Sequence, residues 1–363
     1  MRRPTFAAVA LIVSALAAQH APALQPSDWR LEPIVRFWGL GLYAEYSGLQ
    51  LFAQRDTRLV AGFDGAYESV AFYRNVDGSD YRPPEPGVFL SSGEAGYDRV
   101  NLNWVAGIEQ GISKRGSLDR SAVYLLSLYR GRFDRNFHNG SLLFQSGLQD
   151  APGILQTSLI AGIGVDLMHE DAASATRDGL FFESTFEIAP SFLLNTLFSE
   201  SDYSRLDMEL RGFTALRGIP FLGSFSSLAF SSRVILDALF GPTIPVHARQ
   251  SIGGSRYETA VGGVIRGVHE GRFDGTVKLI VNSDARFNFP RIIGFIIPAV
   301  LIYADAGLYD DLTGSLVFTR DRLFLAAGGG IVLNVLGTDL SCLVNYFARE
   351  RLWSLSVDFG AHY

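Results

Sequence analysis

The sequence predicts an all-β chain that forms a transmembrane, up-and-down antiparallel β-barrel of about fourteen strands, within a range of about twelve to sixteen. Polar and apolar side chains alternate along many segments, turn residues separate these segments, and an apolar run precedes them at the N-terminus. Alternation with period two is typical of a strand with one apolar and one polar face. We expect a single barrel domain over residues 34–363, because all-β barrels can exceed about 200 residues as one domain.

The strands are expected at residues 35–46, 49–54, 58–73, 99–112, 121–132, 156–168, 182–188, 207–211, 226–239, 277–287, 298–308, 323–336, 339–347 and 352–363. Ser47-Gly48 is expected to turn the first hairpin. Two further stretches rich in turn residues, 75–96 and 133–153, are expected to be long loops. Short turns that alternate with longer loops are the pattern of an up-and-down barrel.

The N-terminus resembles a secretory signal peptide over residues 1–23, and residues 24–33 are expected to be a short periplasmic lead. Arg2 and Arg3 precede an apolar run over 6–18, and Ala21-Pro22-Ala23 fits a cleavage site. A membrane anchor is the alternative, although this run is shorter than the roughly 20 residues that a spanning helix needs. An exported chain of this kind belongs in the periplasm or the outer membrane, and the strand patterns favour the bacterial outer membrane.

Strand 277–287 shows which face of the wall is polar. Lys278, Asp284 and Arg286 share one face, which a dry core would not accept unpaired, whereas the opposite face is apolar. A wet lumen and a lipid-facing outside explain this pattern. An array of soluble hairpins is the alternative, but it would place charge outside. Aromatic residues near the expected strand ends are typical of membrane girdles: Trp29, Trp38, Tyr73, Trp104, Tyr346 and Trp353.

The composition and the scattered polar residues argue against other classes of protein. A net charge of -6 with no basic stripe indicates no nucleic-acid partner. The single cysteine, Cys342, excludes an intrachain disulfide, and the six histidines show no metal-ligand spacing. No G-x-S-x-G motif is present. We therefore expect no enzymatic activity, no metal and no cofactor, with a barrel phospholipase as the alternative.

Three motifs in the second half of the chain resemble the bacterial surface antigen family, which includes the barrels of the outer-membrane assembly proteins BamA and TamA and the two-partner secretion pores. That family carries a V-R-G-F-like motif at the tip of its sixth extracellular loop, then N-x-E-x-R and F-x-D-x-G on following strands. The matching residues are Ile265, Arg266, Gly267 and Val268, then Asn282, Asp284 and Arg286, then Tyr303, Asp305 and Gly307. The ending Phe359-Gly360-Ala361-His362-Tyr363 resembles the C-terminal strand signal of such barrels.

The resemblance implies that the motif loop folds back into the lumen. A guanidinium can form a forked pair with a carboxylate, so we predict that Arg266 enters the lumen and pairs with Asp305, with Asp284 as the neighbouring acid. A solvated surface arginine is the alternative. Val268 replaces the motif's aromatic residue, and Asp284 replaces its glutamate.

The resemblance also implies a function and partners. The barrel would assist the insertion or translocation of proteins through a seam between its first and last strands. Expected partners are outer-membrane lipid, unfolded outer-membrane proteins and a separate periplasmic accessory protein. The last is expected because the family's periplasmic polypeptide-binding repeats have no counterpart between the expected cleavage site and the first strand. The alternatives are a passive transport pore, a structural barrel without assembly activity, and a soluble periplasmic β-protein.

Overall fold

A computed structural model gives the structure of most of the chain. The described residues are 29–36, 39–52, 55–71, 96–113, 122–145, 147–171, 176–217, 227–255, 259–260, 264–268, 273–292, 294–311, 322–335 and 338–359. The expected signal peptide over 1–23 lies outside them. No α-helix in this described part is long and apolar enough to cross a membrane.

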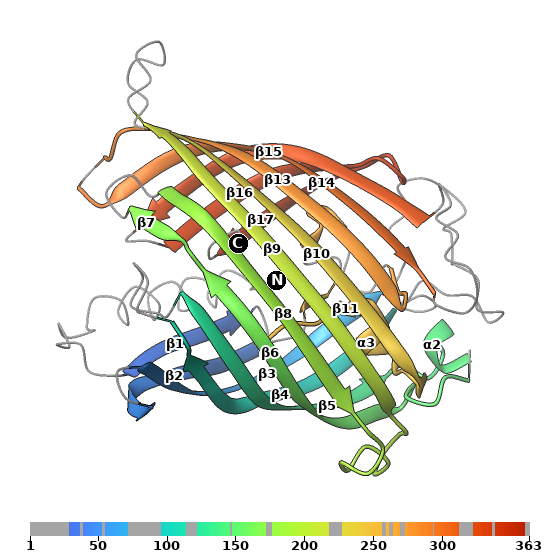
Figure 1. Cartoon of the computed structure of the whole chain (residues 1–363). Coiled ribbons are helices and arrows are strands. Elements are labelled where there is room, and N and C mark those ends of the chain that lie inside the picture. The colour runs from blue at the N-terminus through green and yellow to red at the C-terminus, as the bar shows by residue number, and fades with distance from the viewer. Residues whose placement is uncertain are drawn as a thin grey trace.

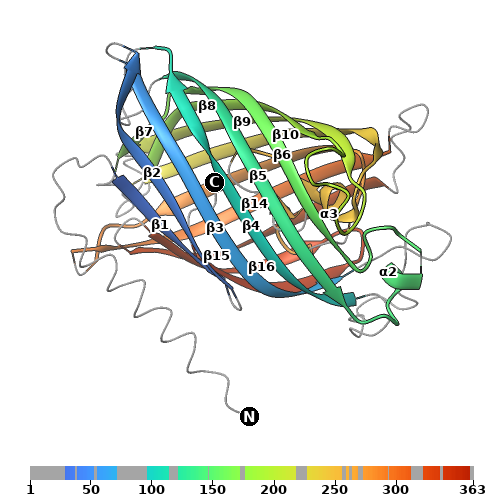
Figure 2. The ribbon, with the colours of Figure 1, turned by 90° about the horizontal axis from the view of Figure 1, so that it is seen from below.

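The predicted fold class is confirmed. Fourteen strands pair antiparallel in chain order, from first to last, in one sheet. The sheet curls into a barrel-shaped wall (Figures 1 and 2). Its strands are β1 (Trp29–Arg36), β2 (Gly39–Phe52), β3 (Arg55–Ala71), β4 (Gly96–Gly111), β5 (Val123–Phe137), β6 (Gly153–Asp166), β8 (Thr176–Ala189), β9 (Asp202–Arg217), β10 (Ser227–Thr243), β13 (Val277–Asn288), β14 (Ile296–Asp310), β15 (Leu323–Val335), β16 (Thr338–Phe347) and β17 (Leu352–Phe359).

The remaining elements are short and lie outside this succession of strands. β7 (His169–Asp171) follows the end of β6 and pairs with the first residues of β8. The helix α2 (Leu142–Gln145) lies in the connection between β5 and β6. The connection between β10 and β13 contains α3 (Val246–Gln250), β11 (Ser251–Ile252) and β12 (Thr259–Ala260), and β11 pairs with β12.

The side chains of the strands divide between the two faces of the wall, as the alternation predicts. On β13, Lys278, Asn282 and Asp284 are buried inside, whereas Leu279 and Val281 are exposed outside. The outer face of β17 likewise presents Trp353, Leu355 and Val357. An apolar outside around a polar inside is the distribution of a transmembrane barrel, because lipid solvates the outer face and polar groups pair or meet water within.

The first hairpin differs from the prediction. β1 begins at Trp29, inside the range expected to be a lead, and β2 runs through Ser47 and Gly48 without a turn. The pairing of β2 with β3 instead becomes irregular between Tyr46 and Leu49. A glycine inside a strand often marks such a bulge rather than a turn, and the two are hard to distinguish from local sequence.

Two smaller differences concern strand ends. β5 continues to Phe137, past the residue at which a loop was expected to begin. Trp104, expected near a strand end, lies in the middle of β4, where its indole covers Gly131 of β5. Trp353 does lie near the start of β17, and its ring packs 4.8 Å from that of Tyr346.

Candidate functional site

The connection between β10 and β13 comprises residues 244–276, and we refer to it as the lumen loop. Its described residues lie inside the barrel. Counted along the strand order, the lumen loop is the fifth connection at its end of the barrel. In the family that the motif at residues 265–268 resembles, the motif lies in the sixth extracellular loop. The helix α3 of the lumen loop lies within the curve of the wall (Figure 2). The described part of the loop contacts inward side chains of β5, β9, β10, β13, β14, β15 and β16.

Arg266 in the lumen loop lies between two carboxylates of the wall. Its Nε and Nη2 donate to the two oxygens of Asp305, at 2.9 and 2.6 Å, and its backbone N–H donates to the same carboxylate at 3.0 Å. Nη2 also donates to Asp284 at 2.6 Å. All three side chains are nearly or fully buried. Charge-assisted hydrogen bonds of this forked kind are strong and fix the orientation of the guanidinium.

The strand register brings these acids together. Asp284 on β13 faces Tyr303 on β14, and Asn282 faces Asp305, so the two carboxylates lie diagonally across one strand pair. The guanidinium carbon of Arg266 lies 3.7 Å from the centre of the Tyr303 ring, within reach of a cation–π contact. The Tyr303 hydroxyl donates in turn to Asn345 of β16. The arginine is therefore held by charge on one side and by an aromatic face on another.

The other motif residues position the tip of the loop. Gly267 has a φ of 82°, a region that favours glycine, and a Cβ there would lie 2.7 Å from the Cβ of Asn345. Asn282 donates to the carbonyl of Val264 at 3.0 Å. Arg286 does not join this group. It forms a forked pair with Asp339 of β16, at 2.6 and 3.1 Å, and thus ties β13 to β16 inside the barrel.

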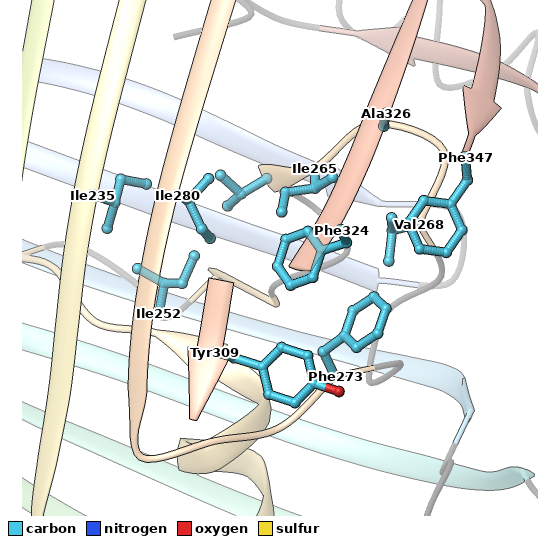
Figure 3. Packing of buried hydrophobic residues seen from close by; sticks show 11 residues of the cluster. Ile235, Ile252, Ile265, Val268, Phe273, Ile280, Tyr309, Phe324, Ala326 and Phe347 are labelled. Carbon is cyan, nitrogen blue, oxygen red and sulfur yellow. The ribbon is translucent and has the colours of Figure 1, made fainter. Parts of the chain in front are cut away.

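Apolar packing holds the loop against the wall. Ile265 is fully buried, and the ring of Phe273 stacks on that of Phe324 at 4.7 Å (Figure 3). Gly307 makes room for this stack, because a Cβ there would lie 1.7 Å from the Phe324 ring. The whole cluster consists of Ile235, Ile252, Val264, Ile265, Val268, Phe273, Ile280, Tyr309, Phe324, Ala326 and Phe347.

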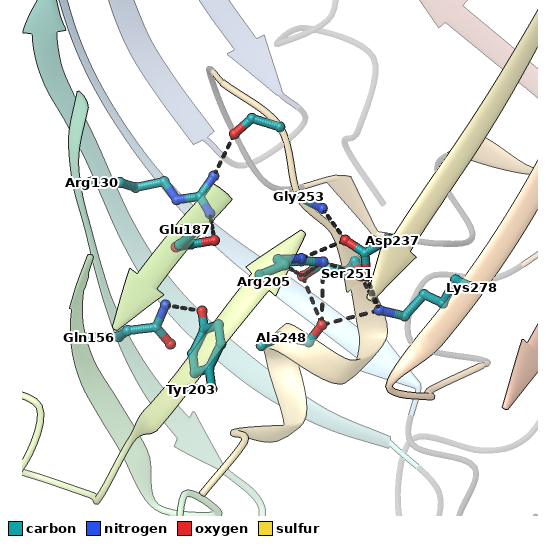
Figure 4. Close-up of polar contacts among 11 residues, drawn as sticks. Arg130, Gln156, Glu187, Tyr203, Arg205, Asp237, Ala248, Ser251, Gly253 and Lys278 are labelled. Atoms are coloured by element: carbon teal, nitrogen blue, oxygen red, sulfur yellow. Dashed lines mark hydrogen bonds and ion pairs between the residues drawn. The ribbon is translucent and has the colours of Figure 1, made fainter. Parts of the chain in front are cut away.

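A second polar cluster anchors the start of the lumen loop (Figure 4). Asp237 of β10 accepts from Arg205 of β9 at 2.6 Å and from Lys278 of β13 at 2.8 Å, and all three side chains are buried. Both cations also donate to the carbonyl of Ser251, and the backbone N–H of Gly253 donates to Asp237. The loop therefore supplies backbone partners to buried charges of the wall.

Sequence reasoning did not identify this anchor. Lys278 lies on the polar face of its strand, as the alternation predicts. No local pattern links Arg205, Asp237 and Lys278, because they belong to three different strands. Another contact also joins residues that are far apart in the sequence. Arg130 of β5 pairs with Glu187 of β8 and donates to the carbonyl of Gly254 at 3.1 Å.

The expected C-terminal strand signal is described only in part. Phe359 ends β17 and pairs in register with Leu340 of β16. Gly360 and Tyr363 lie outside the described residues.

The fold and the lumen loop define a transmembrane type of β-barrel that holds described residues of one of its own connections inside. No protein-family model matches the chain, and no curated protein matches its sequence. Among solved structures, the chain is similar to CdiB from Acinetobacter baumannii, with a TM-score of 0.48 and 11% identity. That match covers 88% of this chain and 50% of CdiB, so the chain spans half the length of this relative.

The chain is also similar to the beta domain of the Bordetella autotransporter Brka, with a TM-score of 0.25 and 10% identity over 91% of this chain and 95% of that one. Neither TM-score reaches 0.5.

Proposed function

We propose that this chain is a barrel of the bacterial outer membrane that assists the insertion or translocation of polypeptides. The observation that carries the proposal is the lumen loop held by Arg266 on Asp305 and Asp284. A loop that is held inside the wall argues against a wide open channel as the main activity. Its position agrees with the resemblance of these motifs to the surface antigen family.

The outer wall supports a membrane location. Side chains such as Leu159, Ile163, Phe186, Ile302 and Leu355 are exposed on the outside of the barrel. In water, so many exposed apolar side chains on one continuous wall would promote aggregation. In a bilayer they are solvated by acyl chains, which is the arrangement that transmembrane barrels use.

The first and last strands support a role in handling other chains. Among the described residues, β1 pairs only with β2, and β17 pairs only with β16. A strand that is paired on one side presents unpaired N–H and C=O groups on the other, and such an edge is a template for strand addition. We propose that an unfolded outer-membrane protein binds at this seam, and that a separate periplasmic accessory protein delivers it. No enzymatic step is part of the proposal.

The test is deletion of the gene, followed by quantitative proteomics of the outer membrane. We expect several other barrel proteins to be depleted and to recover when the wild-type gene is restored. Complementation with Arg266→Ala should restore less than complementation with Arg135→Ala, which removes an exposed arginine of β5. An unchanged outer-membrane proteome, together with steady conductance of the purified barrel in planar bilayers, would instead identify a passive pore.

A further inference from the structure

The connection between β8 and β9, residues 190–201, has a surface that the proposed function does not use. It joins the ends of the two strands at the end of the barrel that also carries the lumen loop (Figure 1). Residues 188–199 contain no ionisable side chain. We refer to residues 190–199 as the apolar loop; the exposed Glu200 follows it.

The apolar loop folds over the outside of the wall rather than over the lumen. Thr157 of β6 lies on the outward face, since Gln156 and Ser158 on either side belong to the inward row, yet Thr157 is only 2% exposed. Its hydroxyl donates to the carbonyl of Leu193 in the loop. Phe198 packs edge to face on Phe133 of β5, with ring centres 5.6 Å apart. Phe133 is also outward, because its neighbours Arg132 and Asp134 form an ion pair in the lumen.

Asn195 fastens the loop to the edge of β6. β8 ends at Ala189, so Thr157 has no partner residue on β8. The side-chain amide of Asn195 replaces that partner: its oxygen accepts from the Thr157 N–H at 2.6 Å, and its nitrogen donates to the Thr157 carbonyl at 2.9 Å. The same nitrogen donates to the carbonyl of Pro190 at 2.8 Å. Leu194 next to it has a φ of 63°, which an ordinary residue adopts only when its surroundings impose it.

The apolar loop presents its large apolar side chains outward. Phe192, Leu194, Leu197 and Phe198 are each more than half exposed. They continue the exposed apolar row of the wall, to which Phe186 of β8 belongs. Internal hydrogen bonds also satisfy loop backbone groups, including Ser201 N–H to the Asn195 carbonyl at 2.9 Å and Leu193 N–H to the Pro190 carbonyl at 3.1 Å.

From this arrangement we infer that the apolar loop binds acyl chains of the membrane leaflet at its end of the barrel. The inference rests on the membrane location in the proposed function. Lipid is the occupant that the geometry favours, because the exposed side chains are continuous with the lipid-facing wall. A segment at the boundary of the hydrocarbon region needs backbone polar groups that are hydrogen-bonded within the protein and side chains that carry no charge. Residues 190–199 offer a protein partner no charged group that would set its orientation.

The test is site-directed spin labelling of the full chain in vesicles of phosphatidylethanolamine and phosphatidylglycerol. The background is Cys342→Ser, which removes the single native thiol. Phe192→Cys and Leu197→Cys carry the label on the apolar loop. Ile163→Cys carries it on the outer wall of β6, and Asn139→Cys carries it on an exposed polar position of the β5–β6 connection. The measured quantity is the ratio of collision rates with oxygen, which concentrates in lipid, to those with a water-soluble nickel chelate.

We expect the ratio at the two loop labels to match that of the Ile163→Cys label and to exceed that of the Asn139→Cys label. A loop ratio equal to that at Asn139→Cys would place the loop in water and overturn the inference. An immobilised label that neither reagent reaches would indicate a protein contact and would overturn it as well. If the Ile163→Cys label itself gave an aqueous ratio, the membrane location would fail first, so the two failures can be distinguished.

Discussion

Asp305 accepts three hydrogen bonds from Arg266, one from its backbone N–H, one from Nε and one from Nη2. The carboxylate thus fixes both the side chain and the main chain of the loop tip. Asp284 accepts a hydrogen bond from Nη2. The loop therefore depends on Asp305 for its conformation and on Asp284 mainly for additional charge.

Arg266→Ala should lower the stability of the barrel by about 3–5 kcal/mol, because it leaves two buried carboxylates without their shared cation. The readout is the temperature at which the barrel loses its folded, fast-migrating form in detergent gels. Arg266→Lys should give an intermediate temperature, since it keeps the charge but loses the fork. Arg135→Ala is the control and should melt like the wild type. Equal melting of Arg266→Ala and the wild type would contradict the proposed role of Arg266 in holding the lumen loop.

Asp305→Asn should destabilise the barrel more than Asp284→Asn. A hydrogen bond to a charged group contributes about 1.5–3 kcal/mol, and Asp305 accepts more of them from Arg266. Asp284→Asn leaves the cation of Arg266 paired with the anion of Asp305. The same melting assay ranks the two variants, and the reverse order would show that the loop conformation does not depend on Asp305.

Gly267→Ala should lower the stability of the barrel more than Gly294→Ala, although both glycines have a similar φ, 82° and 74°. The left-handed conformation alone costs a non-glycine residue about 1–2 kcal/mol. A Cβ added at Gly294 would have no other atom within 4 Å, whereas one added at Gly267 would lie 2.7 Å from the Cβ of Asn345. Gly267→Ala should therefore add an overpacking cost of about 1–3 kcal/mol, measured as the stability difference between the variants. Equal losses would mean that the loop tip can move away from β16.

Acidification should tighten the contact between the β5–β6 connection and α3. Burial raises the pKa of Asp150 to about 6 from 3.8, although its carboxylate accepts from the Val246 N–H at 2.7 Å. Asp150 lines a cavity of about 370 Å³ with Arg249, Asp274 and Asp311, and Asp134 also raises its pKa.

Because the folded pKa is raised, ionised Asp150 costs stability above pH 6, and this cost is relieved as the pH falls from about 6 towards 4. Hydrogen exchange of residues 246–250 should therefore slow, after correction for its intrinsic pH dependence, between pH 7 and pH 5. Asp150→Asn should remove this dependence. If Asp150→Asn kept the same pH dependence of exchange, that dependence would belong to another titratable group.

Local sequence was sufficient for the strands and for the faces of the wall. Alternation on β13 correctly placed Lys278, Asn282 and Asp284 inside, because a strand has a fixed period of two. The motif residues of the lumen loop could also be paired in advance, through their resemblance to a family. Local sequence was insufficient at Ser47-Gly48, where the same two residues suit a turn or a bulge, and strand pairing decides between them.

The sequence by itself determined that this chain forms a barrel with apolar groups outside and charged groups inside, because that division follows from the side-chain period of each strand. Only the tertiary structure decided which charges meet. Arg205, Asp237 and Lys278 come together, and Asn195 replaces a missing strand partner of Thr157, through strand register and loop path. These are contacts between distant segments, and their free energy depends on geometry that no local pattern of residues encodes.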